Sequence, residues 1–329
     1  MTSRPLLAAF ACALLLPCVA VAPARAQDNY PTKPIRWIVT YAVGGGVDIS
    51  ARIYTAKMAE ILGQQIIVDN RPGAGGVIGA DAGAKAAPDG YTVLNADTAS
   101  FGINPWLYKK LPYDPEKDFE PVGQAIATSF TFAIPTSFPA TDLKSFIATV
   151  RAAPGKYSYG SPGIGTLPHL CAERTKAAIG GLDLAHAAYR GAGPAVNDLV
   201  AGQIAASWLV PATLIPHMQG GKLRALGVAT LERDPAMPDV PTLEEQGVKG
   251  VNCMGWFGVF VPAKTPAPII KKLNAALNTA LADKQVQERL AATGLRPTPG
   301  TTPESFDKMV RQDRAEWGPV VKSLGMQLD

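Results

Sequence analysis

The stretch Ile35-Arg36-Trp37-Ile38-Val39-Thr40-Tyr41 is a short apolar run, rich in β-branched and aromatic residues, that leads into Gly44-Gly45-Gly46. A helical pattern starts directly after these glycines, with Ile49 and Ile53 on one face and Gly63 as a stop signal. The order of strand, glycine-rich loop and helix predicts one repeating unit of an α/β fold.

The same rhythm continues along the chain and predicts a series of strands separated by helices. Alternation of this kind favours parallel strands joined by right-handed helical crossovers. Thr301 and Glu304 have the spacing of a capping box for the last helix. The predicted strands after the first are 65–69, 91–94, 131–134, 157–159, 185–189, 204–209, 223–230 and 254–261.

Two extended apolar segments, 119–135 and 252–262, are flanked by proline and have the character of crossings between lobes. Two crossings predict a hinge and a discontinuous first lobe. We therefore expect an α/β protein of two lobes, each a mostly parallel sheet flanked by helices, with a ligand in the cleft between them. The expected lobes are 27–130 with 251–329, and 131–250.

Residues 1–26 have the pattern of a secretory signal peptide, with Arg4, an apolar run and a small-residue cleavage site ending at Ala26. We expect cleavage near Ala26 and a periplasmic product. Removal of the leader takes away Arg4 and Arg25 and no acid, so the net charge falls from +4 to +2. A balance so close to neutral disfavours nucleic acid and anionic membranes as partners.

Only Cys171 and Cys253 remain after the leader is removed. An exported protein permits a disulfide between them. Two cysteines in a chain of this size are more often buried singly, which is the expectation we adopt. No His or Cys stands at ligand spacing beside either of them, so we expect no metal.

Three glycine-rich loops join a strand to a helix start, at 42–48, 157–169 and 189–194. Such loops let bare backbone amides approach an anion, aided by the positive end of the helix. The first loop carries neither a P-loop nor a dinucleotide motif, so phosphate binding is disfavoured and no cofactor is expected. Thr166 is placed either to cap its helix or to donate to an anion. Arg71 and Arg190 are either carboxylate anchors or solvated surface residues.

Asp48 stands at the start of the first predicted helix. The simplest interpretation is an N-cap that accepts from the amides of Ser50 or Ala51, with Arg52 as an ion partner four residues on. In the alternative, its carboxylate holds the glycine loop in shape or contacts a positively charged part of a ligand.

Catalytic interpretations find little support. The chain has three histidines, no G-x-S-x-G elbow and no H-E-x-x-H helix. His169 and Cys171 are two residues apart near a helix start, so their side chains diverge. A secreted hydrolase that uses Ser161 or Cys171 remains an alternative, as does a sensing subunit for a membrane signalling partner. We expect no catalytic residues.

An ordered set of motifs covers essentially the whole chain after the leader, and with these motifs the sequence resembles the Bug receptors, the solute-binding proteins of tripartite tricarboxylate transport systems. The motifs are Tyr30-Pro31-Thr32-Lys33-Pro34-Ile35, Gly44-Gly45-Gly46 with Asp48 and Arg52, Asn70-Arg71-Pro72-Gly73-Ala74-Gly75-Gly76, Asp89-Gly90-Tyr91-Thr92, Asn104-Pro105, Leu111-Pro112-Tyr113-Asp114, Gly165-Thr166 with His169-Leu170, Gly221-Lys222-Leu223-Arg224-Ala225-Leu226 and Pro238-Asp239-Val240-Pro241-Thr242.

The resemblance implies a Venus-flytrap fold, a small carboxylate ligand held largely by backbone amides and bridging waters, and a membrane permease as partner. We also expect a monomer. The family usually has Pro at 43, Thr at 47 and Asp at 205, where this chain has Val43, Val47 and Ala205. The changes at 47 and 205 predict a less polar pocket. The ligand-binding residues that carry over are Val43, Gly44, Gly45, Asp48, Asp97, Thr98, Ser100, Thr166, Leu167, His169 and Tyr189.

Overall fold

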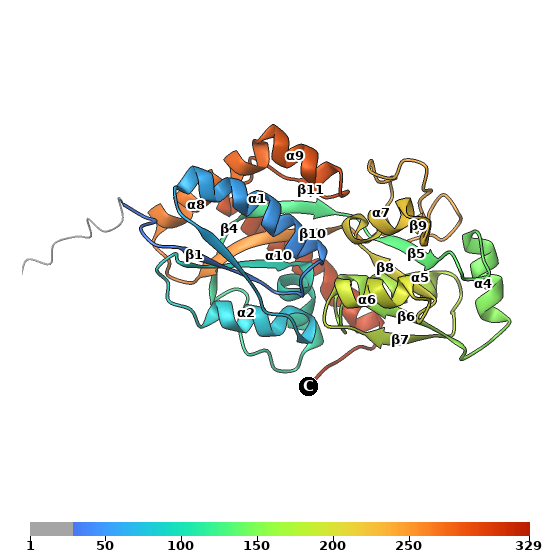
Figure 1. The fold of residues 1–329 in the computed structure, drawn as a ribbon. Coiled ribbons are helices and arrows are strands. Elements are labelled where there is room, and N and C mark those ends of the chain that lie inside the picture. The colour runs from blue at the N-terminus through green and yellow to red at the C-terminus, as the bar shows by residue number, and fades with distance from the viewer. Residues whose placement is uncertain (1–28) are drawn as a thin grey trace, which may run out of the picture. The chain divides into compact units, whose positions relative to one another are not determined.

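The chain builds two mixed β-sheets, one of six strands and one of five, each covered by helices (Figure 1). The computed structural model describes residues 29–329, so the predicted leader at 1–26 lies outside the described residues. Pro31–Asp329 form one unit. Within residues 29–329, no helix combines the length and apolarity needed to cross a bilayer.

The first lobe is the six-stranded sheet with its helices, and its strand order is β11-β4-β10-β3-β1-β2. Its strands are β1 (Ile35–Val39), β2 (Ile66–Asn70), β3 (Thr92–Asp97), β4 (Phe119–Thr128), β10 (Gly255–Pro262) and β11 (Arg296–Pro297). Its helices are α1 (Gly46–Leu62), α2 (Val77–Ala84), α3 (Asn104–Leu107), α8 (Ala267–Ala282), α9 (Lys284–Ala291) and α10 (Pro303–Ser323), with short turns η1 (Ala74–Gly76) and η2 (Ala99–Ile103).

The second lobe is the five-stranded sheet with its helices, and its strand order is β7-β6-β8-β5-β9. Its strands are β5 (Thr131–Pro135), β6 (Tyr157–Ser161), β7 (Leu184–Ala188), β8 (Ala206–Leu209) and β9 (Leu223–Val228). Its helices are α4 (Leu143–Arg151), α5 (Leu167–Ala178), α6 (Ala192–Val200) and α7 (Pro211–Gln219).

The expectation of a two-lobe α/β protein is confirmed, and the sheets are mixed. Strands joined by helical crossovers pair in parallel, as β1 does with β2 and β3, and β6 does with β7 and β8. The strands next to the crossings, β10 and β5, pair antiparallel with their neighbours. A strand that arrives from the other lobe has no crossover helix to impose a parallel direction.

Each lobe has its own apolar core. In the first lobe, α2 and α10 pack on one face of the sheet around Ile38, Leu94 and Phe260, and Phe101 stacks on Phe260 with ring centroids 3.9 Å apart. The opposite face carries α1 with α8 and α9 (Figure 1). In the second lobe, α6 and α7 cover a cluster that includes Ala133.

One disulfide joins Cys171 of α5 to Cys253, which lies just before β10. The expectation of two singly buried thiols is therefore wrong, although both cysteines are fully buried. Their Cα atoms are 5.9 Å apart, inside the range that a disulfide spans. A separation of 82 residues along the chain gives no sign of this proximity.

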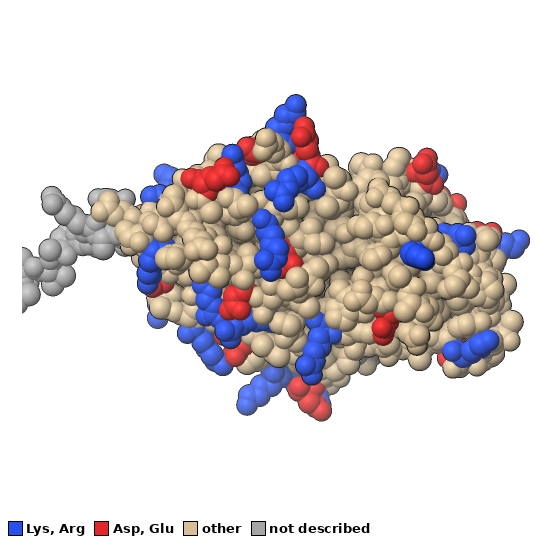
Figure 2. Space-filling view, in the orientation of Figure 1, with Lys and Arg blue, Asp and Glu red and all other residues tan. Residues whose placement is uncertain are grey.

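Charged side chains on the face seen in Figure 2 are interspersed, and neither sign forms a large continuous area. Lys and Arg commonly lie beside an acid, as in the pairs Arg36–Asp69 and Arg311–Asp307. This surface has none of the clustered positive charge that nucleic-acid binding requires.

Candidate functional site

The first glycine loop ends at the start of α1, and its geometry depends on Gly44 and Gly45. Gly44 has φ of +82°, a conformation that glycine adopts without strain, and Gly45 is the N-cap residue of α1. The first amides of a helix lack partners within the helix and carry its positive end. The loop therefore presents donors and positive potential at the carboxyl end of β1.

Asp48 lies inside the first turn of α1, so its interpretation as the N-cap is wrong. Its carboxylate accepts from the Gly44 amide at 3.0 Å, from Arg52 Nε at 2.9 Å and from Asn70 Nδ2 at 2.9 Å. The expected ion pair with Arg52 is present. Asp48 is 2% exposed and ties the loop to α1 and β2, which is the loop-holding role left open from the sequence.

The turn after β3 is organised by Asp97. Its Oδ2 accepts from the Tyr41 hydroxyl at 2.8 Å, and its Oδ1 accepts from the amide and hydroxyl of Ser100 at 3.1 and 2.9 Å. Burial raises the pKa of the Asp97 carboxyl above its usual value. Thr98 turns away and accepts from the Trp256 amide, which links β3 to β10.

The glycine loop of the second lobe lies between β6 and α5, and its polar side chains are satisfied within the loop. The Thr166 hydroxyl donates to the Gly163 carbonyl at 2.7 Å, and Nδ1 of His169 accepts from the Gly165 amide at 3.1 Å. His169 stacks on His186, and burial followed by the charge on His186 lowers the pKa of His169 to about 3. Both hydroxyl and imidazole therefore shape the loop.

Tyr189 begins the third glycine loop, and its side chain points toward α6. The hydroxyl donates to Asp198 Oδ2 at 2.6 Å, and burial and this hydrogen bond raise the pKa of Tyr189 to about 12. Its ring packs beside Gly160, and a Cβ added to Gly160 would lie 3.1 Å from this ring. Arg190 is exposed, and Arg71 pairs with Asp69 at the surface. Of the two interpretations left open from the sequence, both arginines therefore fit that of solvated surface residues.

Glycine-rich segments of the two lobes meet across the boundary between the lobes. A Cβ on Gly191 would lie 3.1 Å from the Ala42 amide nitrogen, and one on Gly75 would lie 2.8 Å from the Ile164 carbonyl. These glycines let backbone of the first lobe touch backbone of the second. The starts of α1, α5, α6 and α7 are thereby brought around one cavity.

That cavity has a volume of about 40 Å³ and is mostly apolar. Of the residues predicted to bind ligand, Gly45, Asp97 and Thr166 line it. The other predicted residues do not line it, and Val43 among them is 63% exposed. The lining residues are Tyr41, Gly45, Gly46, Val47, Asp97, Phe130, Pro162, Thr166, Pro168, Ala192, Leu209, Val210 and Phe257.

The apolar lining was only partly visible in the sequence. The sequence predicts that Val47 and Ala205 make the pocket less polar. Val47 does line the cavity. Ala205 does not line it, and its amide donates to the Ser158 carbonyl. Phe130 and Phe257 lie within the two predicted crossings, 119–135 and 252–262, and this position at the predicted hinge was the signal that could have revealed them.

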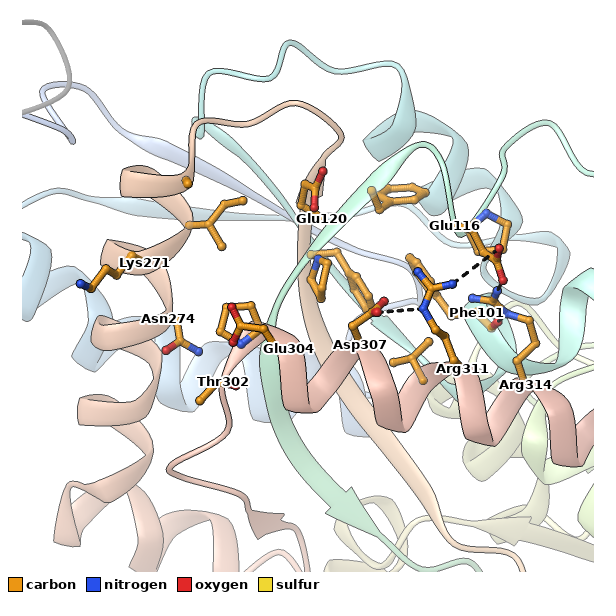
Figure 3. A pocket seen from close by; sticks show the side chains of 18 residues that line it. Phe101, Glu116, Glu120, Lys271, Asn274, Thr302, Glu304, Asp307, Arg311 and Arg314 are labelled. Carbon is orange, nitrogen blue, oxygen red and sulfur yellow. Dashed lines mark hydrogen bonds and ion pairs between the residues drawn. The ribbon is translucent and has the colours of Figure 1, made fainter. Parts of the chain in front are cut away.

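A larger groove of about 720 Å³ lies in the first lobe between α8 and α10 (Figure 3). Four of its charged side chains are paired with one another: Arg314 bonds to Glu116, and Arg311 bonds to Asp307. Lys271 and Asn274 lie on the opposite wall in Figure 3. It lies apart from the helix starts, so we do not assign it the ligand.

The two nucleophiles of the hydrolase alternative are unsuited to that role. Cys171 is in the disulfide and has no thiol. Ser161 is fully buried and does not line the cavity, and its Oγ lies 2.7 Å from Nε2 of His186. Among the described residues, no group of His, Cys, Asp and Glu is arranged to hold a metal.

Two α/β lobes that enclose a small cavity between helix starts define a solute-binding receptor of the periplasmic binding protein class. Residues 50–326 match the tripartite tricarboxylate transporter family receptor. This chain belongs to that family, and within it to the Bug receptors.

Known proteins resemble this chain over most of its length, in sequence and in structure. The UPF0065 protein of the tcbD-tcbE intergenic region of Pseudomonas sp. is 38% identical to this chain, and the alignment covers 90% of this chain and 88% of that protein. BugT of Bordetella pertussis is 35% identical and covers 92% of each chain.

Three solved structures share the fold over about nine-tenths of this chain. The periplasmic binding protein BugD has a TM-score of 0.87 at 34% identity, covering 91% of this chain and 99% of its own. Rpa4515 of R. palustris with adipate has a TM-score of 0.87 at 30% identity, covering 91% and 99%. MatC of Rhodopseudomonas palustris with bound malate has a TM-score of 0.84 at 33% identity, covering 89% and 100%.

Proposed function

We propose that this protein captures a small organic carboxylate in the periplasm and delivers it to a membrane permease. The observation that carries the proposal is the meeting of helix starts from both lobes around one cavity, in whose lining the described part of the chain places no Lys or Arg. Helix starts attract anions through their free amides and dipoles. A carboxylate matches this arrangement in charge and in acceptor geometry.

The available interactions are strong enough without a cationic side chain. A hydrogen bond to a charged group contributes about 1.5–3 kcal/mol, and a favourable helix terminus contributes up to about 2 kcal/mol. Three or four such donors approach the roughly 8 kcal/mol of micromolar binding. The apolar part of the lining, including Phe130 and Phe257, would then hold the carbon skeleton of the ligand.

Several further observations support the proposal. The related proteins Rpa4515 and MatC have structures with adipate and malate, both carboxylates. Cys171 and Cys253 form a disulfide, and disulfides persist in oxidising compartments such as the periplasm. This agrees with export directed by a leader at 1–26. We further propose that the protein acts as a monomer, with its hinge at the two crossings between the lobes.

The site residues take distinct roles in this proposal. Gly45 and Thr166 border the ligand, while Gly44 and Leu167 shape the loops that border it. Asp48 and His169 hold the two glycine loops in their binding geometry. Thr98, Ser100 and Tyr189 support the loops from behind, and Val43 is the exposed residue of the first loop.

Calorimetry of the purified protein against aliphatic and aromatic carboxylates tests the proposal. We expect at least one of them to bind with an affinity near micromolar and to raise the melting temperature. If none binds and none raises the melting temperature, the carboxylate class is wrong.

A pair of variants at Val47 tests whether the ligand binds in the cavity beside the start of α1. Val47→Asp places a negative charge in the first turn of α1, beside the cavity, where the helix itself tolerates an acid. We expect it to weaken carboxylate binding by about a hundredfold or more, and Val47→Asn, of equal size but neutral, to weaken it by less than about tenfold. Equal effects of the two variants would show that the ligand binds elsewhere.

A further inference from the structure

Asp97 is the one acidic residue in the lining of the cavity, and no basic residue lines that cavity among the residues that the structure describes. It is 8% exposed. A carboxylate is an unexpected group beside helix starts that favour anions, because it opposes the charge of the ligand that those helix starts attract. The cavity therefore has one anion-favouring side and one carboxylate of its own.

The Asp97 carboxylate is held by neutral donors. Its Oδ1 accepts two hydrogen bonds from Ser100, and its Oδ2 accepts one from Tyr41. Each carboxylate oxygen can accept about two hydrogen bonds, so Oδ2 has capacity for another donor. Because Asp97 borders the cavity, a ligand is in a position to supply that donor.

The size of the cavity brings any ligand close to Asp97. The cavity, of about 40 Å³, is small, and Asp97 lines it together with Gly45 and Thr166 at two of the helix starts. A group bound at the helix starts therefore lies within a few ångströms of Asp97. A hydroxyl or ammonium group at that point would donate to Oδ2, whereas a second carboxylate would be repelled by it.

We propose that Asp97 determines specificity, and that the protein prefers a carboxylate whose skeleton also carries a hydroxyl or ammonium group over the matching plain carboxylate. This inference rests on the proposed function and narrows its ligand class. The competing role for Asp97 is structural: its bonds to Ser100 and Tyr41 fix the turn that leads into η2.

The preference is measured with matched ligands that differ only by the donor group. Three series serve: propionate, lactate and alanine; succinate, malate and aspartate; phenylacetate, mandelate and phenylglycine. Calorimetry on the full purified protein gives the ratio of affinities within each series. We expect at least one series in which a donor-bearing member binds about tenfold or more tighter than the plain acid.

Asp97→Asn then removes the charge and keeps the size of the side chain. We expect the preference to fall by about tenfold, with the affinity for the plain acid rising. Ser100→Ala is the matched control, because it removes one hydrogen bond of the turn, from the Ser100 hydroxyl to Asp97 Oδ1, and leaves the Asp97 carboxylate with its bonds from the residue 100 amide and Tyr41. We expect the preference to persist in that variant.

Each outcome distinguishes this inference from the proposed function. Wild-type protein that binds plain and donor-bearing acids equally would overturn the inference and leave carboxylate capture intact. Binding of no carboxylate at all would overturn both. If Asp97→Asn and Ser100→Ala weaken all ligands by the same factor, Asp97 has the structural role only. If Asp97→Asn does not fold, the affinity ratios of the wild-type protein for donor-bearing and plain acids still test the proposed preference.

Discussion

His169 acts as a neutral acceptor in the glycine loop of the second lobe. The Gly165 amide donates to its Nδ1, so the ring binds the loop only while that nitrogen is free of a proton. The groups around the ring are His186, Glu173 and Lys176. Burial and the neighbouring His186 oppose protonation, and for this reason the loop keeps its shape over the ordinary pH range.

A pH dependence of stability follows from the lowered pKa of His169. The unfolded chain binds the proton near pH 6.5 and the folded chain only near 3, so stability is present above about 6.5 and is lost as the pH falls toward 3. His169→Asn keeps an acceptor near the Nδ1 position and does not titrate. We expect the wild type to lose about 1 kcal/mol relative to this variant for each pH unit below about 6.

Urea unfolding of both proteins between pH 7 and pH 5 provides the measurement. His217→Asn, on α7 outside the site, serves as the control and should follow the wild type. Parallel stability curves for wild type and His169→Asn would mean that His169 is protonated in the fold and does not hold the loop through Nδ1.

At the scale of the elements, the site is made by the places where helices begin. The start of α1 in the first lobe meets Val210, which precedes α7 in the second lobe. A Cβ on Gly46 would lie 2.7 Å from Val210 Cγ2 and 3.3 Å from the Phe257 ring. Gly46 therefore owes its place to a close approach between lobes, in addition to any need for backbone freedom.

Gly46→Ala tests this approach. We expect the added methyl group to hold the lobes apart and to weaken ligand binding by about tenfold or more. The melting temperature of the ligand-free protein should change little, because the clash is relieved by separation of the lobes. Adding Val210→Ala to Gly46→Ala should recover most of the affinity. Undiminished binding by Gly46→Ala would contradict closure at this point.

Most elements were predictable because each has a strong local pattern. The glycine loops, α1 with its stop at Gly63, and the strands near both crossings lie within a few residues of their expected positions. The cap of α10 was misplaced by one residue: Thr302 and Ser305 form the box, since Pro303 takes the first helical position. Thr301 instead donates to Gln124 of β4.

The cavity was less predictable than the elements around it. Leu209 and Val210 have an ordinary strand sequence, and their part in the cavity depends on how far the lobes approach one another. Asp97 shows the same limitation, because its partners Tyr41 and Ser100 come together only in the folded sheet. Long-range geometry of this kind leaves no local periodicity in the chain.

At the scale of the whole molecule, the disulfide fastens the second lobe to the segment that returns to the first. Cys171 lies on α5, and Cys253 lies two residues before β10. Arg174, one turn after Cys171, adds hydrogen bonds to the carbonyls of Gly250 and Asn252. The return segment is therefore held covalently and by hydrogen bonds against α5.

Removal of this disulfide should lower stability and leave affinity largely unchanged. Closing a loop of 82 residues removes unfolded-state entropy worth about 4.5 kcal/mol in the chain-entropy model. We expect Cys171→Ser with Cys253→Ser to lower the free energy of unfolding by about 2–4 kcal/mol. Urea unfolding with and without reductant measures this, and thiol titration of the untreated protein should find no free thiol at these positions. An unchanged unfolding free energy would contradict the prediction.

The position of β10 between β3 and β4 has a consequence for how the chain folds. The second sheet uses only β5 to β9, which are consecutive in the chain, so it can assemble as soon as those residues are available. The first sheet must wait, because β3 and β4 are joined only through β10, which arrives more than a hundred residues after β4. Until then both strands present open edges, the condition under which incompletely folded chains associate wrongly. The lobe that begins first along the chain is thus the lobe that finishes last.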